Sequence, residues 1–311
     1  MPVRRSVTIP EPATIKSAAP AIAFGLLGIA LVGASVPVTG LLDDYPLFAA
    51  QSVRYLIGAA GLFGWLVLRG QRLPKLVPRD LLALGAVATL GMVGFSICVL
   101  LAQRHADPGF VTAMVGSAPL VLGILAPLLA GRRPGRWVIG GATLVLVGVV
   151  VLSGGGSWQG PGLLLACLAM FGEVSFTLFA VGPIRRLGAI GASAYACLIA
   201  AIGAGVVSAV AEGPPAWRLP DATETVALIV LGLLVTSVAF VWWFHCVSRI
   251  GADRAAVLIG AMPVAGLVAS VCLSAQQLTS AALLGAALVA AGCAVGLRRV
   301  GPSRPAHRPR A

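Results

Sequence analysis

The sequence predicts an all-α integral membrane protein with ten transmembrane helices, arranged as two inverted five-helix repeats. Three observations lead to this prediction. First, 59% of the 311 residues are hydrophobic and only 10% are charged, whereas a soluble chain needs about 25% charged residues to cover its surface. Second, the apolar residues form separate runs long enough to cross a bilayer. Third, residues 116–148 match residues 260–292 without a gap.

The apolar runs are continuous and do not alternate, which indicates helices and not a membrane barrel. An α-helix needs about 20 apolar residues to cross the hydrocarbon core. The expected spans are 18–39, 46–68, 80–102, 109–130, 137–153, 162–183, 188–210, 225–247, 254–274 and 279–297. This division predicts an N-terminal tail (1–17), a first five-helix repeat (18–153), a second five-helix repeat (160–298) and a basic C-terminal tail (299–311).

The basic residues predict the orientation of the helices. If the N-terminus is cytoplasmic, nearly all of the 22 Lys and Arg residues fall on the cytoplasmic side. The outer loops then contain only Arg104 and Arg218, and Arg54 lies inside a span. Positive residues favour the cytoplasmic side, so we expect a multi-pass protein of the inner or plasma membrane with both termini in the cytoplasm. The net charge of +12 therefore reflects topology, and the expected partner is the lipid bilayer and not nucleic acid.

The internal match has an offset of 144 in residue number, which is called the repeat offset below. It aligns Gly116 with Gly260, Pro119 with Pro263, Gly141 with Gly285, and Gly148 with Gly292. Further upstream the register is looser, and Gly33 aligns with Gly172 at an offset of 139. A repeat of five helices is odd, so the second copy enters the membrane from the opposite side. Transporters are often built from such inverted halves, with the substrate between them near the middle of the bilayer.

Several motifs occur in the order found in one known family. They are Leu31-Val-Gly-Ala-Ser35 in the first span, Pro46 followed by Arg54-Tyr55 in the second, the two Gly-x-x-Pro segments, and Gly160-Pro-Gly-Leu-Leu-Leu-Ala166 at the start of the second half. Over about residues 18–298 the chain resembles the EamA family of the drug/metabolite transporter (DMT) superfamily, although the first motif lacks the family's Trp. The resemblance implies a ten-helix bundle that moves small metabolites, often exporting amino acids or related compounds.

Glu173 lies near the middle of the sixth span. A carboxylate at this depth is costly unless it is protonated, paired or in a water-filled cavity. It is therefore a candidate proton carrier or cation contact, expected to face the cavity between the halves. The alternative is a protonated acid that bonds to a neighbouring helix. Thr177 lies one turn further on the same face and is a candidate second polar contact.

Arg54 lies in the second span, closer to its outer end. One interpretation is that its side chain extends to the outer lipid headgroups. The other is that it pairs with an anionic substrate or with a structural carboxylate such as Asp44.

Two prolines lie in the middle of their spans. Pro119 and Pro263 each lack the N–H that would bond to a carbonyl one turn earlier, and Gly116 and Gly260 precede them. Free carbonyls at this depth are tolerated where they line a cavity or find another partner. These residues, with Ser117, are therefore candidates for a substrate cavity or hinge, and the alternative is a purely structural kink.

Two further features have plainer interpretations. The Trp242-Trp243 pair is typical of a membrane-interface belt, and His245 beside it is expected to be interfacial. Aromatic residues make up only 6% of the chain, which gives weak support to an aromatic cage for a flat substrate. Gly292 and Gly296 form a close-packing motif that fits either packing within the bundle or a homodimer.

The sequence has no P-loop, no HExxH, no GxSxG and no Cys/His cluster. We therefore expect no enzyme activity, no metal and no cofactor, and the energy for transport must come from a gradient. The leading hypothesis is a secondary transporter that exports small metabolites by alternating access, with proton exchange as one option for coupling. Alternatives are a nutrient importer or a drug efflux carrier and, from another class, a membrane enzyme or an accessory subunit for lipid flipping.

Overall fold

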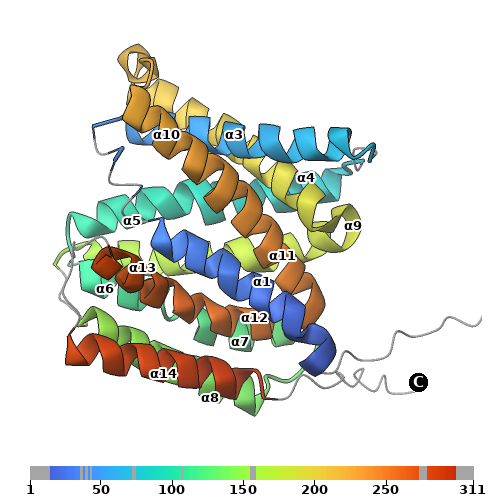
Figure 1. The fold of residues 1–311 in the computed structure, drawn as a ribbon, viewed down its shortest axis with the longest axis vertical. Coiled ribbons are helices and arrows are strands. Elements are labelled where there is room, and N and C mark those ends of the chain that lie inside the picture. The colour runs from blue at the N-terminus through green and yellow to red at the C-terminus, as the bar shows by residue number, and fades with distance from the viewer. Residues whose placement is uncertain are drawn as a thin grey trace, which may run out of the picture.

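The computed structural model describes residues 15–35, 38, 41–42, 44–71, 75–106, 108–154, 159–272 and 279–298. All structural statements below concern these residues. The expected C-terminal tail and most of the expected N-terminal tail lie outside them. Every secondary-structure element in the described part is helical (Figure 1).

Each of the ten expected spans contains helix. The first half has α1 (Ile15–Ala34), α3 (Leu47–Leu68), α4 (Pro78–Ala86), the π-helical segment η1 (Val87–Gly94), α5 (Phe95–Gln103), α6 (Pro108–Val115), α7 (Ala118–Leu129) and α8 (Arg136–Ser153). The second half has α9 (Gly162–Ala211), the 3-10 turn η2 (Pro214–Trp217), α10 (Ala222–Val230), the π-helical segment η3 (Leu231–Val238), α11 (Ala239–Ile250), α12 (Ala252–Ala255), the 3-10 segment η4 (Ala256–Gly260), α13 (Ala261–Cys272) and α14 (Ser280–Gly296).

Several of these helices are suited to a membrane. Within the described residues, five are long and apolar enough to cross one, namely Leu47–Leu68, Pro78–Ala102, Gly162–Ala211, Ala222–Ile250 and Ala252–Ala269. Shorter apolar helices cover Ala18–Ala34, Ala118–Leu129, Arg136–Leu152 and Ser280–Gly296. The longest is broken at Gly188, where φ is 74° and ψ is 170°. This conformation is strained for other residues, and it divides α9 into segments 162–187 and 189–211.

Two helical rods have the same internal construction. In each, nine residues of α-helix lead into eight residues of π-helix, and α-helix follows again. The rods begin at Pro78 and Ala222, which are separated by the repeat offset, and every internal boundary keeps this separation. Each rod also has a carboxylate at its third position, Asp80 or Glu224, which accepts a hydrogen bond from the backbone N–H before the helix. Negatively charged groups near the N-terminus of a helix interact favourably with the helix dipole.

Helices α8 and α14 lie side by side along one edge of the bundle (Figure 1). A Cβ added at Gly141 would lie 2.6 Å from the carbonyl oxygen of Gly292, and one added at Gly148 would lie 2.8 Å from that of Gly285. Only glycine allows backbones to approach this closely. The Gly292-x-x-x-Gly296 motif thus packs within the chain, because a Cβ at Gly141 would also touch Gly296.

Helix α1 packs against α11, and the first part of α9 packs against η1 and α5. A Cβ added at Gly28 would lie 2.9 Å from the carbonyl oxygen of Ala239, and one added at Gly172 would lie 3.2 Å from Cβ of Phe95. Gly28 and Gly172 are separated by the repeat offset, as are Phe95 and Ala239. These contacts favour an alignment of Gly172 with Gly28, although a Cβ added at Gly172 would also lie 2.9 Å from the carbonyl oxygen of Leu90. Helix α1 has several glycines, and the alignment of Gly33 with Gly172 stays a prediction from the sequence.

Candidate functional site

A cavity of about 180 Å³ lies between α1, α3, the two rods, the first part of α9, and α13. This volume has room for several water molecules. Most of the lining is apolar. The polar or charged side chains that line it are Ser35, Arg54, Tyr55, Ser96 and Glu173.

The cavity is lined by corresponding positions of the two halves. Four pairs of lining residues are separated by the repeat offset: Ile29 and Glu173, Val32 and Phe176, Phe95 and Ala239, and Ser96 and Phe240. The chemistry within each pair differs. The cavity therefore has a symmetric frame with asymmetric side chains.

Glu173 is the acidic residue among the lining residues of this cavity. It is the twelfth residue of α9, counted from Gly162. No described residue forms a hydrogen bond or ion pair with its carboxyl group. The structure thus gives no support to the alternative in which Glu173 bonds to a neighbouring helix, and its carboxyl group is available to the contents of the cavity.

Arg54 lines the same cavity from α3. Its Nε donates a hydrogen bond to Oγ1 of Thr236 on η3, at 2.8 Å. Its guanidinium carbon lies 5.7 Å from the centre of the Tyr55 ring, a favourable distance for a cation–π contact. Among described residues no carboxylate lies within 4 Å of Arg54, including Asp44 and Glu173. The side chain is half-buried, lines the cavity and is bonded to Thr236.

Helix α3, which carries Arg54, is anchored to the second half of the chain. The Glu212 carboxylate accepts hydrogen bonds from the N–H groups of Phe48 (2.8 Å) and Ala49 (3.1 Å). The Ser208 hydroxyl donates to the same carboxylate at 2.8 Å. The N-terminal N–H groups of α3 have no side-chain cap of their own, and a helix end needs such partners. Glu212 provides them and fixes the start of this helix.

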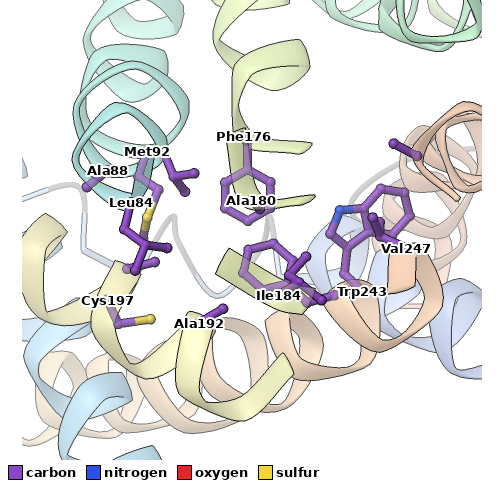
Figure 2. Close-up of a cluster of buried hydrophobic side chains, with 14 of the residues drawn as sticks. Leu84, Ala88, Met92, Phe176, Ala180, Ile184, Ala192, Cys197, Trp243 and Val247 are labelled. Carbon is purple, nitrogen blue, oxygen red and sulfur yellow. The ribbon is translucent and has the colours of Figure 1, made fainter. Parts of the chain in front are cut away.

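Aromatic side chains form much of the cavity wall. Tyr55, Phe95, Phe176, Phe240 and Trp243 all line it. The Phe176 and Phe240 ring centres are 5.0 Å apart, and Figure 2 shows Phe176 and Trp243 on two helices within one cluster of buried side chains. The low aromatic content gave only weak support to an aromatic cage, yet five of the 19 aromatic residues line this one cavity.

The two adjacent tryptophans have different positions. Trp243 is buried and lines the cavity, so its interpretation as part of an interface belt is corrected. Trp242 packs against Phe24, with ring centres 5.6 Å apart. His245 also contacts Phe24 and does not line the cavity. Successive residues on a helix point about 100° apart, which separates the pair.

The predicted proline segment of the first half does not line the cavity. The fourth span is interrupted between α6 and α7, at Gly116 and Ser117. The Ser117 hydroxyl donates to the carbonyl of Met114 at 2.6 Å, and Pro119 is buried. None of these three candidates lines the cavity. The structure therefore shows no direct contact between this segment and the cavity that it was predicted to shape.

The corresponding segment in the second half comes closer. Gly260 ends the 3-10 segment η4 and packs against Val145. Pro263 is half-buried, and its neighbour Met262 is the residue that reaches the cavity. Thr177 is fully buried, its Oγ1 has no hydrogen-bond partner among described residues, and it does not line the cavity.

A second cavity, of about 310 Å³, lies between α7, α9, α11 and α12. Its charged side chains include Arg132 and Asp253, whose Nη2 and Oδ1 atoms are 3.9 Å apart. Helices α9 and α11 line both cavities in turn, since Phe176 and Trp243 line the first, and Ile184 and Val247 line the second. Phe244, the residue after Trp243 on α11, is fully buried and contacts the Phe176 ring.

Comparison with known proteins identifies the family. The model of the EamA-like transporter family matches the chain twice, over residues 19–154 and 160–298. The chain belongs to the EamA-like transporter family. This EamA-like transporter is therefore a multi-pass membrane protein and not an enzyme.

Its relatives are also transporters by name. The uncharacterized transporter YetK of Bacillus subtilis is 24% identical over 78% of this chain and 76% of its own length. A probable terminal-alkyne amino-acid exporter of Streptantibioticus cattleyicolor is 27% identical over 95% of this chain and 94% of its own length. A crystal structure aligns with a TM-score of 0.77 and 22% identity, over 90% of this EamA-like transporter and 99% of the other chain. This last similarity concerns the fold.

Proposed function

We propose that this EamA-like transporter is a ten-helix secondary transporter that exports small zwitterionic metabolites, such as amino acids, by alternating access. Its two five-helix repeats, 18–153 and 160–298, lie in opposite orientations in the membrane, and both termini are cytoplasmic.

The inverted arrangement is supported by contacts that recur at the repeat offset. The contact between Gly141 and Gly292 becomes the contact between Gly285 and Gly148 when the halves are exchanged. The matching bounds of the two π-containing rods and the paired lining positions of the cavity follow the same rule. Two similar halves can exchange conformations, which gives outward-open and inward-open states of similar energy.

The observation that carries the substrate class is the presence of Arg54 and Glu173 in one cavity without an ion pair between them. Leaving two charged groups unpaired inside a membrane protein is costly, and a bound solute with both charges offsets that cost. An amino acid has a carboxylate for Arg54 and an ammonium group for Glu173. The aromatic wall then suits an apolar side chain. The relative named as an amino-acid exporter is consistent with this class.

Glu173 also supports proton coupling. If its carboxyl group releases a proton when an ammonium group arrives, and takes one up when that group leaves, substrate and proton move in opposite directions. A drug efflux carrier for lipophilic cations needs the acid but not Arg54, so the charged pair favours the zwitterion. A nutrient importer would use the same site in the other direction.

The test uses the purified protein in liposomes, with and without a proton gradient. Three solutes of similar shape are compared: leucine, 3-methylbutylamine, which lacks the carboxylate, and 4-methylpentanoate, which lacks the amine. We expect gradient-driven, saturable transport of leucine and much slower transport of the other two. Equal rates for all three, or transport of the amine alone, would contradict the zwitterion site.

A further inference from the structure

Thr236 is the residue that holds Arg54 at the edge of the cavity. Its side chain is fully buried, and its Oγ1 accepts the hydrogen bond from Arg54 Nε at 2.8 Å. It lies in η3, a π-helical segment, and such segments are frequent at functional sites. Nothing in the sequence pattern singled out this threonine.

Close packing fixes the threonine in this position. A Cβ added at Gly58 would lie 3.0 Å from Cγ2 of Thr236, and one added at Gly232 would lie 3.0 Å from the carbonyl oxygen of Arg54. The two glycines thus let α3 and η3 approach each other closely. The neighbouring Ser237 hydroxyl lies 3.0 Å from the carbonyl oxygens of both Gly58 and Gly232, so its one proton is shared between a bond to α3 and a bond within η3.

The first half of the chain lacks this polar contact. At the repeat offset, Thr236 corresponds to Met92, and Arg54 corresponds to Leu198. Both counterparts are apolar, and they belong to η1 and to the second part of α9. The Arg54–Thr236 pair is therefore one of the features that make the symmetric frame chemically asymmetric. A purely structural contact at this interface does not need it, since the corresponding interface forms without it.

We infer that Thr236 is a positioning residue for the carboxylate of the substrate, acting through Arg54; this inference rests on the proposed transport of zwitterions. A guanidinium group has five N–H donors and binds a carboxylate with two parallel hydrogen bonds. The bond to Thr236 occupies the Nε–H. The carboxylate is therefore bound by the two terminal nitrogens, Nη1 and Nη2, which restricts the angle at which the substrate lies in the cavity.

The experiment measures binding of leucine and of 3-methylbutylamine to purified variants in nanodiscs. Thr236→Val has the same shape but no hydrogen-bond acceptor, so we expect about tenfold weaker leucine binding and unchanged binding of the amine. Thr236→Ser keeps the hydroxyl and should restore leucine binding to within about twofold. Ser237→Ala removes a hydroxyl from the same interface that does not contact Arg54, and it is the matched control.

Three outcomes would overturn the inference. Equal weakening of leucine and amine by Thr236→Val would mean a general structural role. Unchanged leucine binding would mean that the Arg54 contact is irrelevant to the substrate. In an Arg54→Lys background, Thr236→Val should have little further effect, and a full additive loss would also contradict coupling between the two residues. If the wild-type protein itself does not bind leucine, the proposed function and this inference fail together. If the wild-type protein binds leucine and Thr236→Val binds it equally well, only the inference fails.

Discussion

Ile29 and Glu173 stand at corresponding positions of the two repeats and line the same cavity from the two halves. One position is apolar and the other is acidic, although the surrounding contacts correspond. The adjacent glycines, Gly28 and Gly172, each pack against the helix that follows a π-helical segment. The acid therefore has an apolar residue as its counterpart at the repeat offset, which fits the proposed role of Glu173 in substrate binding.

Glu173→Gln should abolish gradient-driven transport of leucine, because glutamine keeps the shape and polarity but cannot release a proton. Exchange of labelled for unlabelled leucine without a gradient should persist at a reduced rate. Both are measured in liposomes at equal protein content. Normal gradient-driven flux in this variant would exclude Glu173 as the proton carrier.

The proposed topology places residues 213–222 outside and both termini in the cytoplasm. A single cysteine introduced at Ala222, in a chain without its other cysteines, should react with a membrane-impermeant thiol reagent added to whole cells. A cysteine introduced at Arg133 should react only after the membrane is opened. The reverse pattern would exclude the proposed orientation, and labelling of both positions from the same side would exclude the ten-helix arrangement.

Gly148→Ala should destabilise the protein by about 1–3 kcal/mol, because the new Cβ would meet the backbone of α14 at 2.8 Å. Gly140 lies on the same helix, where an added Cβ meets nothing within 4 Å. Gly140→Ala is thus a matched control and should be neutral or stabilising by about 0.5–1 kcal/mol. Thermal unfolding in detergent compares the two, and equal effects would argue against the close contact of α8 and α14.

Glu212→Ala should cost about 1 kcal/mol of stability, because the N-terminal N–H groups of α3 lose their acceptor. Asp44→Ala changes an exposed acid near the same end of the bundle and should have little effect. Since α3 carries Arg54, the Glu212 variant should also bind leucine more weakly. A melting temperature equal to that of the Asp44 variant would show that the cap is unimportant.

The helices were predictable because continuous apolar runs leave few alternatives in a membrane. The π-helical segments were not, since a change from i+4 to i+5 hydrogen bonding over Val87–Gly94 does not alter hydropathy. Arg218 was predicted to lie in an outer loop, but its bond to Glu224, at 2.8 Å, was not. That hydrogen bond raises the pKa of Arg218. The sequence alone could not show this, because the hydrogen bond depends on how the two side chains lie in the folded chain.

The candidate site was partly predictable. Glu173 stood out because an acid inside an apolar run is costly, and Arg54 for the same reason. Thr177 shares the helix face of Glu173, yet Phe176 is the neighbour that lines the cavity. Helical periodicity defines a stripe about 100° wide, and side-chain packing decides which residues in that stripe reach the cavity. No sequence pattern distinguished Thr236, because a threonine in an apolar helix is common and its hydrogen-bond partner is known only from the structure.

The glycine contacts between α8 and α14 have a consequence for the transport cycle. When two inverted halves exchange conformations, every contact between them is replaced by the contact at the corresponding positions. The contacts of Gly141 with Gly292 and of Gly148 with Gly285 are images of each other and are similarly tight. In the proposed cycle this exchange would leave the contact between α8 and α14 unchanged, so these two helices would form a fixed interface while the other helices move. Weakening the contact between α8 and α14 should lower the amount of folded transporter without changing the equilibrium between its outward-open and inward-open states.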